Sequence, residues 1–268
     1  MASNDLVMGV DIGGTGVKAA LVDIKKGVLT TERVRLDTPQ PAIPDAIIGC
    51  IQELQKALKW KGAVGCGFPG LVKGGKVRRA PNLDPSWIGH DLATDLKEKM
   101  GVSVVAIGND ADAAGLAEVT FGAGKGIEGT AVMVTLGTGI GTAVFHNGDL
   151  LPDTELGHLE LGGKDAERTA SNSVRERKGL KWKKWAKGVD KYLTHLEYLL
   201  GVDLFMLGGG VSKKPDKFVP YLKKVSVPIV AATMGNMAGI VGAAMFAIPG
   251  MRAEARKSKK KASKKKSR

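Results

Sequence analysis

Two glycine-threonine turns are the segments of this sequence best suited to binding a ligand. The first is Asp11-Ile-Gly13-Gly14-Thr15-Gly16-Val-Lys18, and the second is Leu136-Gly137-Thr138-Gly139-Ile-Gly141. Each turn joins two runs of strand-forming residues, so its tip exposes several backbone N–H groups, and such a cluster binds anions. We therefore predict that both turns hold phosphate groups, through Gly13, Gly14, Thr15 and Lys18 in the first and through Gly137, Thr138 and Gly139 in the second.

A single turn of this kind would more often be an ordinary hairpin than a binding site. The presence of two such turns favours binding, in which the two halves of the molecule hold one phosphate-bearing ligand. The first turn is not a Walker loop, because Lys18 is not followed by Ser or Thr. It is not a Rossmann fingerprint either, because its glycines lead into a second strand rather than into a helix.

Polar side chains also gather where a predicted strand ends and a predicted helix begins, in Asn109-Asp110-Ala-Asp112. Ligands of α/β sheets bind at the carboxyl ends of the strands, so these side chains are expected to face a ligand. A carboxylate there can accept the proton of a substrate hydroxyl that attacks phosphorus. The alternative is helix capping by Asn109 or Asp110, which the local sequence by itself slightly favours.

A third cluster, Glu155-Leu-Gly-His158-Leu-Glu160, follows the second turn. Carboxylates and an imidazole close together can hold vicinal sugar hydroxyls, each of which both donates and accepts hydrogen bonds. A structural zinc site is not expected, because no cysteine and no second histidine lie nearby. A lone histidine is more often structural than functional, and this alternative stays open for His158.

The elements that must position these residues alternate between strands and helices. Together with the duplicated hairpin, this order predicts an α/β protein of two halves with a cleft between them. We expect a first domain over residues 1–108, a second over 109–236, a helix at 237–250 that returns to the first domain, and a basic tail at 251–268. The predicted strands are 6–10, 17–22, 63–68, 102–107, 130–136, 142–145 and 202–207, and the predicted helices are 45–59, 111–121, 190–200 and 236–246.

The composition fits a soluble α/β protein: the chain has 268 residues, of which 43% are hydrophobic. No apolar run approaches the roughly 20 residues that cross a membrane, and Met1–Asp5 lacks the pattern of a signal peptide. Cys50 and Cys66 are too few for a disulfide framework, so we expect reduced thiols and a cytoplasmic location, with no membrane partner.

The net charge of +13 is concentrated in two segments. Residues 251–268 contain ten basic residues and one acid, and residues 175–191 contain eight basic residues and two acids. The rest of the chain is nearly neutral, so the two segments indicate a polyanionic partner. A solvated tail and a charged helix face are the structural alternatives.

Five motifs in this order make the chain resemble the ROK family of sugar kinases. They are Asp11-Ile-Gly-Gly-Thr15, Asn109-Asp110-Ala-Asp112, Leu136-Gly-Thr-Gly139, Glu155-Leu-Gly-His158 and Leu207-Gly-Gly-Gly-Val-Ser212. The resemblance spans about residues 7–248. It implies a two-domain actin/hexokinase-like (ribonuclease H-like) ATPase fold with an interdomain cleft, and by family habit a homodimer.

The resemblance also implies roles for individual residues. Asp110 is expected to be the general base, and the two turns are expected to hold the transferred phosphates. Gly208, Gly209 and Gly210 match a segment near the nucleotide. Asp11 is the expected carboxylate for Mg²⁺, through water. The residues expected to contact the sugar are Asn82, Asn109, Asp110, Glu155, His158 and Glu167.

One departure from the family concerns zinc. Most ROK proteins have a cysteine-rich zinc motif between the positions of His158 and Glu167, whereas this chain has no cysteine there. We therefore expect no zinc site. The zinc-free stretch and the two basic segments are similar to the polyphosphate glucokinase branch of the family.

The expected reaction is phosphoryl transfer from polyphosphate or ATP to the 6-hydroxyl of glucose, with mannose as an open second acceptor. Cations along a phosphate chain would come from Lys181, Lys183, Lys184 and Lys187, or from the tail over residues 257–266. Two alternatives stay open: a kinase that uses only ATP on another hexose or an N-acyl-hexosamine, and a non-catalytic polyanion binder. A repressor of the same family is disfavoured, because ten residues precede Asp11 and leave no room there for a DNA-binding domain.

Overall fold

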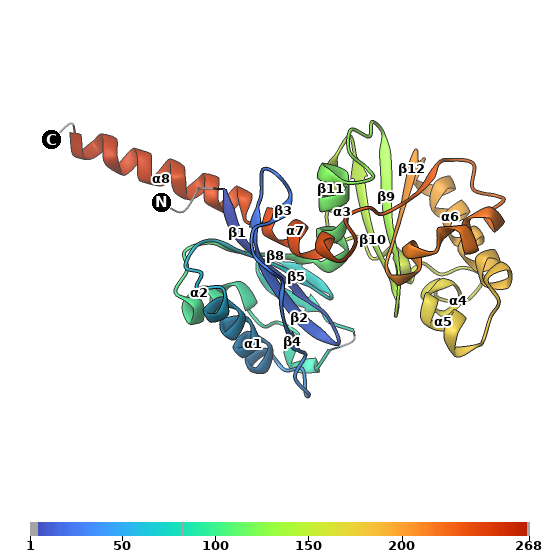
Figure 1. The fold of residues 1–268 in the computed structure, drawn as a ribbon, viewed down its shortest axis with the longest axis horizontal. Helices are drawn as coiled ribbons and strands as arrows, with labels where there is room; N and C mark the ends of the chain where they lie inside the picture. Colours follow the sequence, from blue (N-terminus) through green and yellow to red (C-terminus); the bar gives the residue numbers. More distant parts are fainter. Residues whose placement is uncertain (1–4, 82, 267–268) are drawn as a thin grey trace. The chain divides into compact units, whose positions relative to one another are not determined.

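The computed structural model describes residues 5–81 and 83–266, with side chains up to Lys257. The chain forms two compact units (Figure 1). Unit 1 ends at Ala113 and resumes at Gly239, and unit 2 is Ala114–Ala238. The chain therefore passes from one unit to the other within helix α3 (Asp110–Phe121) and again at the start of α7 (Ala238–Met245).

Unit 1 is built on a mixed sheet. Its strands β1 (Leu6–Ile12), β5 (Val64–Phe68) and β8 (Val105–Asn109) are parallel, in the order β1-β5-β8. Antiparallel β2 (Gly16–Asp23) extends the sheet beside β1 and pairs on its other side with β3 (Val28–Leu29) and β4 (Val34–Asp37). Asp11 is in register with Gly67, and Phe68 with Asn109, so the carboxyl ends of the three parallel strands lie at one edge.

Helices α1 (Pro44–Ala57) and α2 (Leu92–Met100) cover one face of this sheet. The apolar stripe of α1 is buried against the sheet, as its helical spacing predicts. Asp91 caps α2 by accepting a hydrogen bond from the Thr94 N–H at 3.1 Å, and Gly101 ends the helix in the left-handed conformation. The small hairpin β6 (Leu71–Lys73) and β7 (Lys76–Arg79) lies between β5 and α2 in the sequence.

Helix α7 packs against the same sheet at glycines. A Cβ at Gly9 would lie 2.0 Å from the carbonyl oxygen of Ile240, and a Cβ at Gly65 would lie 1.8 Å from that of Ala243. Only glycine permits this approach of helix and strand. The chain then continues as α8 (Ile248–Lys266), so the basic tail begins as a helix, which suits its Lys, Arg and Ala content.

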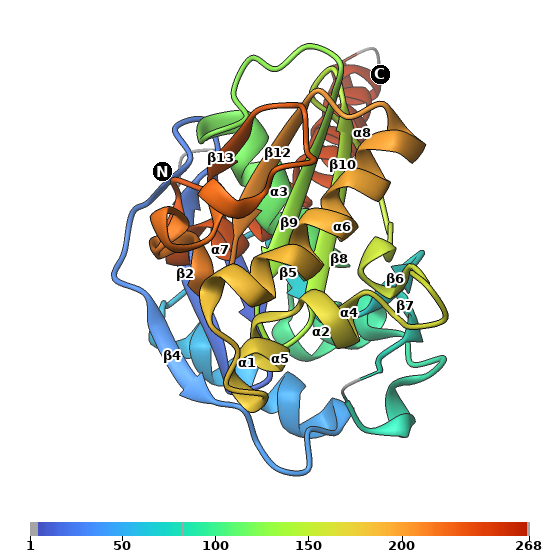
Figure 2. The same cartoon turned by 90° about the vertical axis from the view of Figure 1, so that its right-hand side faces the viewer.

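Unit 2 contains a five-stranded sheet in the order β11-β10-β9-β12-β13. Its strands are β9 (Thr130–Leu136), β10 (Ile140–His146), β11 (Asp149–Leu151), β12 (Leu204–Gly208) and β13 (Ile229–Ala231). Helix α6 (Trp182–Leu200) packs on one face with α4 (Glu167–Ala170) and α5 (Asn172–Arg177) nearby (Figure 2). Helix α3 contributes to the core on the other face, where the alternate side chains of β9 and β10 lie.

The long elements lie where the sequence predicts them, with two clear differences. Helix α8 extends over most of the segment that was expected only as a basic tail. The helix expected from residue 190 begins at Trp182, because Trp185, Ala186 and Val189 continue its buried stripe. The lysines among them hide that stripe in the sequence. The short strands β3, β4, β6, β7, β11 and β13 and the helices α4 and α5 were not predicted, since each is too short to show a period. Helix α2 was also missed, although its buried Leu92, Leu96 and Met100 repeat at helical spacing.

Candidate functional site

The first glycine turn joins β1 to β2 and is closed by its own backbone. The Gly13 N–H donates to the Gly16 carbonyl at 3.1 Å. From β4 and the residue after it, Arg35 donates to the Thr15 carbonyl at 2.8 Å and Thr38 to the Gly13 carbonyl at 2.6 Å. Gly14 and Thr15 at the tip are exposed. Arg35, which also forms an ion pair with Asp37 at 2.8 Å, is a contact of the turn that the motif did not reveal.

Asp11 and Lys18 face each other across the β1–β2 pair, at the base of this turn. The Lys18 Nζ lies 3.0 Å from the Asp11 Oδ2, and both side chains are largely buried. The start of α7 also approaches Asp11: a Cβ at Gly239 would lie 3.2 Å from the Asp11 Cγ. The predicted phosphate ligand Lys18 and the predicted metal ligand Asp11 thus form one ion pair.

Asn109 and Asp110 lie at the carboxyl end of β8, on the same sheet edge as Asp11. The buried Asn109 accepts hydrogen bonds from the N–H groups of Ala111 at 2.8 Å and Asp112 at 3.1 Å, and donates to the Gly70 carbonyl at 3.2 Å. Asn109 therefore caps α3, which is the alternative that the local sequence favoured. This cap places Asp110, partly exposed, as the first residue of the helix.

The second glycine turn joins β9 to β10 in unit 2. The Gly137 N–H donates to the Gly139 carbonyl at 3.0 Å, and Ser173 of α5 donates from its N–H to Gly137 at 3.0 Å and from its hydroxyl to Thr138 at 2.6 Å. A Cβ at Gly209 would lie 2.7 Å from the Leu136 carbonyl oxygen. The structure therefore brings the segment Gly208–Gly210 against the second turn. No motif in the sequence singles out Ser173.

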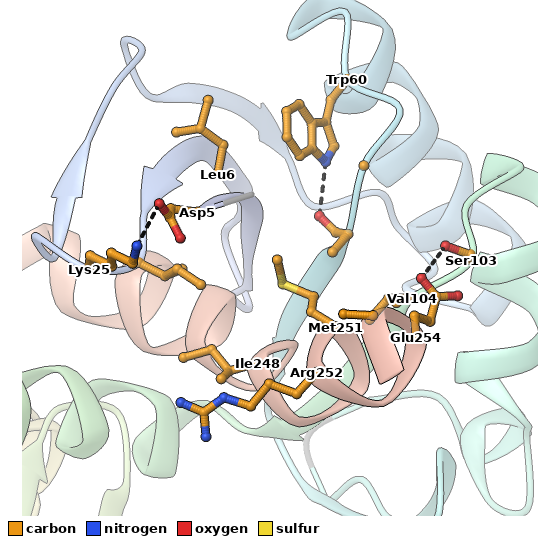
Figure 3. A pocket seen from close by; sticks show the side chains of 14 residues that line it. Asp5, Leu6, Lys25, Trp60, Ser103, Val104, Ile248, Met251, Arg252 and Glu254 are labelled. Carbon is orange, nitrogen blue, oxygen red and sulfur yellow. Dashed lines mark hydrogen bonds and ion pairs between the residues drawn. The ribbon is translucent and has the colours of Figure 1, made fainter. Parts of the chain in front are cut away.

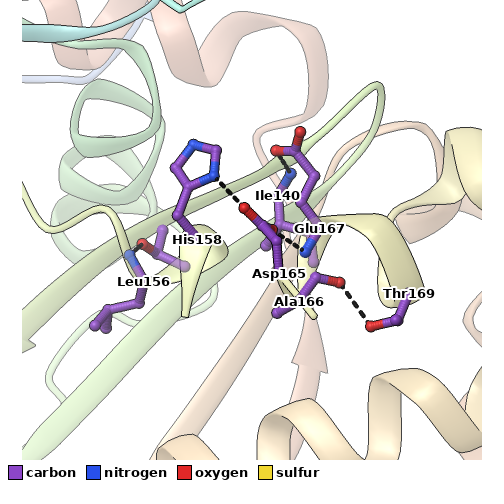
Figure 4. A network of polar contacts seen from close by, with 8 residues as sticks. Ile140, Leu156, His158, Asp165, Ala166, Glu167 and Thr169 are labelled. Atoms are coloured by element: carbon purple, nitrogen blue, oxygen red, sulfur yellow. Dashed lines mark hydrogen bonds and ion pairs between the residues drawn. The ribbon is translucent and has the colours of Figure 1, made fainter. Parts of the chain in front are cut away.

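Two of the predicted sugar ligands of unit 2, His158 and Glu167, lie beside β10 (Figure 4). His158 ends the short 3-10 helix Leu156–His158, which Gly157 allows to approach β10: a Cβ there would lie 2.0 Å from the Ile140 carbonyl oxygen. Glu155 precedes this helix. Glu167, at the start of α4, accepts a hydrogen bond from the Ile140 N–H at 3.0 Å. Carboxylates and imidazole thus gather near the end of β10 that begins at the second turn.

His158 forms an ion pair that sequence reasoning missed. Its Nδ1 lies 2.9 Å from the Oδ2 of Asp165. The hydrogen bond to Asp165 raises the pKa of His158 above its usual range, against the opposing effect of partial burial, and the charges of Asp165, Glu167 and Glu155 add to the increase. The imidazole is therefore held close to three carboxylates and carries a proton at higher pH than a free histidine.

The basic residues 175–191 form part of a larger charged surface. Lys181, Lys183, Lys184 and Lys187 are all exposed at the start of α6. The Trp182 ring lies under the Arg175 guanidinium, at 4.0 Å from the ring centroid, and stacks on Phe218. A second lysine-rich segment, residues 213–224, is thereby brought beside the first, with the Lys183 Nζ 5.8 Å from the centroid of the Tyr221 ring. The sequence did not predict that these two lysine-rich segments lie side by side.

Two of the predicted positions lie outside the described residues. These are Asn82 and the side chains of the tail after Lys257. Over the rest of the chain, no group of three or more His, Cys, Asp or Glu side chains is arranged to hold a metal ion. In that same described part, every helix is too short or too polar to span a bilayer.

Unit 1 also has a pocket of about 770 Å³ (Figure 3). It lies where β1, β5 and β8 begin and is lined by Leu6, Trp60, Val104 and Met251, with Arg252 and Glu254 of α8 beside them. None of the predicted site residues lines it. It lies at the end of the strands opposite to Asp11 and Asp110, so it is separate from the candidate site.

Comparison with known proteins identifies relatives of this chain in sequence and in fold. The family model described as ROK family matches residues 7–171. The polyphosphate glucokinase of Mycobacterium tuberculosis is 48% identical over 240 residues, which are 90% of each chain. A crystal structure of inorganic polyphosphate/ATP-glucomannokinase from Arthrobacter sp. strain KM is 44% identical, with a TM-score of 0.85 over 91% of this chain and 99% of that one.

A second solved structure is more distant. The ROK family glucokinase from Streptomyces griseus, in complex with glucose and AMPPNP, is 25% identical with a TM-score of 0.77, over 91% of this chain and 99% of that one. The extent of the family match and the identity to these relatives lead to one conclusion: this chain belongs to the ROK family.

Proposed function

We propose that this protein is a hexose kinase that transfers a terminal phosphoryl group from inorganic polyphosphate or ATP to the 6-hydroxyl of glucose. The observation that carries this proposal is the 48% identity to a polyphosphate glucokinase over 90% of both chains. The arrangement of both glycine turns and of the carboxylates described above supports it.

Asp110 is the general base of this proposal. It follows a parallel strand at its carboxyl end, and the Asn109 cap fixes the start of its helix. Its carboxylate orients the sugar hydroxyl and accepts its proton as the oxygen attacks phosphorus. Asn109 is largely occupied by the chain's own backbone, so its main role is to hold Asp110 in place.

The two glycine turns hold the phosphates of the donor. Each offers backbone N–H groups, and the first adds the Lys18 ammonium. Gly208–Gly210 lies against the second turn and is assigned to the nucleotide when ATP is the donor.

Mg²⁺ fits the residues present. Asp11 is a single carboxylate, and one carboxylate together with waters and phosphate oxygens is the ligand set that Mg²⁺ commonly has. The ion would neutralise charge on the donor phosphates. Lys18 holds the Asp11 carboxylate at 3.0 Å and so keeps it in position for this role.

The sugar is assigned to Glu155, His158 and Glu167, with Asn82 as a further predicted contact. Carboxylates accept hydrogen bonds from sugar hydroxyls, and the imidazole can donate or accept. Glu155, His158 and Glu167 belong to unit 2, whereas Asp110 belongs to unit 1.

The lysines at the start of α6 are assigned to the polyphosphate chain. No acidic residue lies in the first turn of this helix, where the helix dipole favours negative charge and lysines are unfavourable. Retaining several lysines there costs stability, which favours a binding role. The neighbouring segment 213–224 adds five lysines to the same surface and one acid.

Glucose 6-phosphate formation with ATP and with polyphosphate, measured separately, tests the proposal. Asp110→Asn is expected to lower turnover by about 10²–10⁴-fold while both ligands still bind. If Asp110→Asn leaves turnover unchanged, Asp110 is not the base. If the wild type is active with ATP but not with polyphosphate, polyphosphate is not a donor. Mannose in place of glucose tests the second acceptor. Deletion of residues 258–268 tests whether the tail assists polyphosphate.

We place the reaction in the cytoplasm, where ATP is available and where the two free thiols Cys50 and Cys66 would stay reduced. The homodimer that the family resemblance implies stays a prediction, which the mass of the protein in solution tests.

A further inference from the structure

We propose that Asp165 is a positioning residue of the sugar site, which orients His158 and Glu167 and decides which ring nitrogen of His158 carries a proton. No motif in the sequence singled out Asp165. The inference rests on the proposed function, because it takes His158 and Glu167 to contact the sugar.

A tight hairpin brings Asp165 back to His158. Gly162 and Gly163 both have positive φ, 64° and 74°, as a two-residue type I′ turn requires. The Leu161 N–H donates to the Lys164 carbonyl at 2.8 Å, and Glu160 pairs with Asp165 as an antiparallel bridge. The glycine pair therefore sets the register that places Asp165 beside the 3-10 helix ending at His158.

Each oxygen of the Asp165 carboxylate holds one predicted sugar ligand (Figure 4). Its Oδ2 lies 2.9 Å from the Nδ1 of His158, and its Oδ1 accepts the N–H of Glu167 at 2.8 Å. The Glu167 carboxylate is anchored in turn by the Ile140 N–H. One side chain thus orients an imidazole and a carboxylate that lie nine residues apart in the sequence.

The chemistry of a carboxylate determines the proton on the imidazole. An ionised carboxylate only accepts hydrogen bonds, so the Nδ1 of His158 must carry a hydrogen. The other nitrogen, Nε2, then accepts a hydrogen bond when the ring is neutral and donates one when the ring is protonated. Asp165 thereby makes the contact that His158 offers to a sugar hydroxyl depend on pH.

Asparagine at position 165 has nearly the same shape as aspartate but would reverse the direction of the hydrogen bond to the His158 Nδ1. Its amide oxygen can still accept the Glu167 N–H, and its amide nitrogen then donates to Nδ1, which moves the hydrogen of the neutral ring to Nε2. In a Ser-His-Asp triad the same exchange keeps the geometry and produces the wrong tautomer. In Asp165→Asn, Nε2 would carry a hydrogen whether the ring is neutral or protonated.

Other charged groups around His158 stay unchanged in this variant. Glu155 precedes the 3-10 helix, Glu167 starts α4, and the Lys191 ammonium of α6 lies at the hairpin tip beside Gly162. The two carboxylates raise the pKa of His158 through their charge, but less than the hydrogen bond to Asp165 does. Loss of the Asp165 carboxylate should therefore lower the pKa of His158 even though Glu155 and Glu167 remain.

Nitrogen-15 NMR of the sugar-free protein tests the proton directly. The chain has four histidines, and His158→Gln identifies the signals of His158 by their loss. In the wild type, we expect the neutral His158 ring to carry its hydrogen on Nδ1. In Asp165→Asn, we expect the neutral ring to carry it on Nε2, and the pKa of His158 to be lower than in the wild type. The same tautomer and pKa in both proteins would overturn the inference.

Glucose kinetics test whether this arrangement matters for the sugar. Asp165→Asn is expected to raise the KM for glucose about tenfold, the loss of one strong hydrogen bond, with kcat changed much less. The wild-type KM should change with pH across the titration of His158, and that of the variant should not. Asp149→Asn removes an exposed carboxylate elsewhere in unit 2 and should match the wild type.

The possible failures are distinct. A changed tautomer with an unchanged KM and pH profile would show that Asp165 does not position the sugar ligands. A wild type that forms no glucose 6-phosphate would refute the proposed function, and with it the role of Asp165 at a glucose site. Thermal melting of each variant separates these outcomes from misfolding.

Discussion

Neutralising the lysines at the start of α6 should weaken the use of polyphosphate and spare that of ATP. The variant replaces Lys181, Lys183, Lys184 and Lys187 with glutamine. All four side chains are exposed, and Lys187 lies three residues after Lys184 and four after Lys183, so it is one helical turn from both. Because lysines oppose the helix dipole at this end, their loss should not destabilise the fold.

The size of the effect follows from counterion release. For a single-stranded polyanion, each phosphate contact contributes about 0.7 to the slope of log affinity against log salt, so four contacts contribute about 2.8. Between about 50 and 200 mM salt, the wild type should then lose about 50-fold more affinity for polyphosphate than the variant. The variant should bind weakly at all salt concentrations and with a shallower slope.

The assay is titration of polyphosphate at several salt concentrations, together with the KM for polyphosphate and for ATP. A matched control replaces Lys56, Lys59, Lys61 and Lys97, four exposed lysines of unit 1, with glutamine. If the α6 variant and this control have equal salt slopes and equal KM values for polyphosphate, the α6 surface does not hold the donor. An equal loss with ATP would show that the lysines act on both donors.

Three further predictions concern stability. The Glu118 carboxylate is fully buried and accepts a hydrogen bond from the Met234 N–H at 2.7 Å. Glu118→Ala should therefore lower the free energy of unfolding in urea by about 2–4 kcal/mol, and Glu118→Gln should lower it less. Equal stability of Glu118→Ala and the wild type would contradict this hydrogen bond. Gly65→Ala should cost about 1–3 kcal/mol by overpacking against α7, and an unaltered midpoint would contradict that close approach. His158 has a raised pKa when folded, so its stabilisation should be present below its usual value of 6.5 and vanish as pH rises through the raised value. The melting temperatures of wild type and His158→Gln should therefore differ more at low pH than at high pH, and a difference independent of pH would contradict the ion pair with Asp165.

Much of the candidate site follows from local rules in the sequence. The two glycine turns are predictable because only a few residue types suit the tip of a tight strand connection. Asn109 is a strong helix cap next to a strand of apolar residues, so its position at the carboxyl end of a parallel strand is also local information. The long helices appear because their apolar residues repeat at helical spacing over several turns.

The partners of these residues depend on the packing of distant segments. Ser173 meets the second turn because α5 packs beside it, and Lys183 meets Tyr221 because Trp182 and Phe218 share a core. Asp165 is joined to His158 by a hairpin whose glycines are visible in the sequence, but the direction of its carboxylate depends on how the hairpin packs.

The sequence by itself thus determined which chemical groups are present and at which strand and helix ends they lie. That information is local, because capping, turn geometry and periodicity depend on neighbours within a few residues. Only the tertiary structure decided which of these groups hold one another, as in the Asp11–Lys18 pair and the bonds of Asp165. The physical reason is that such contacts form only once the burial of apolar side chains, far apart in the chain, has fixed the positions of the elements that carry them.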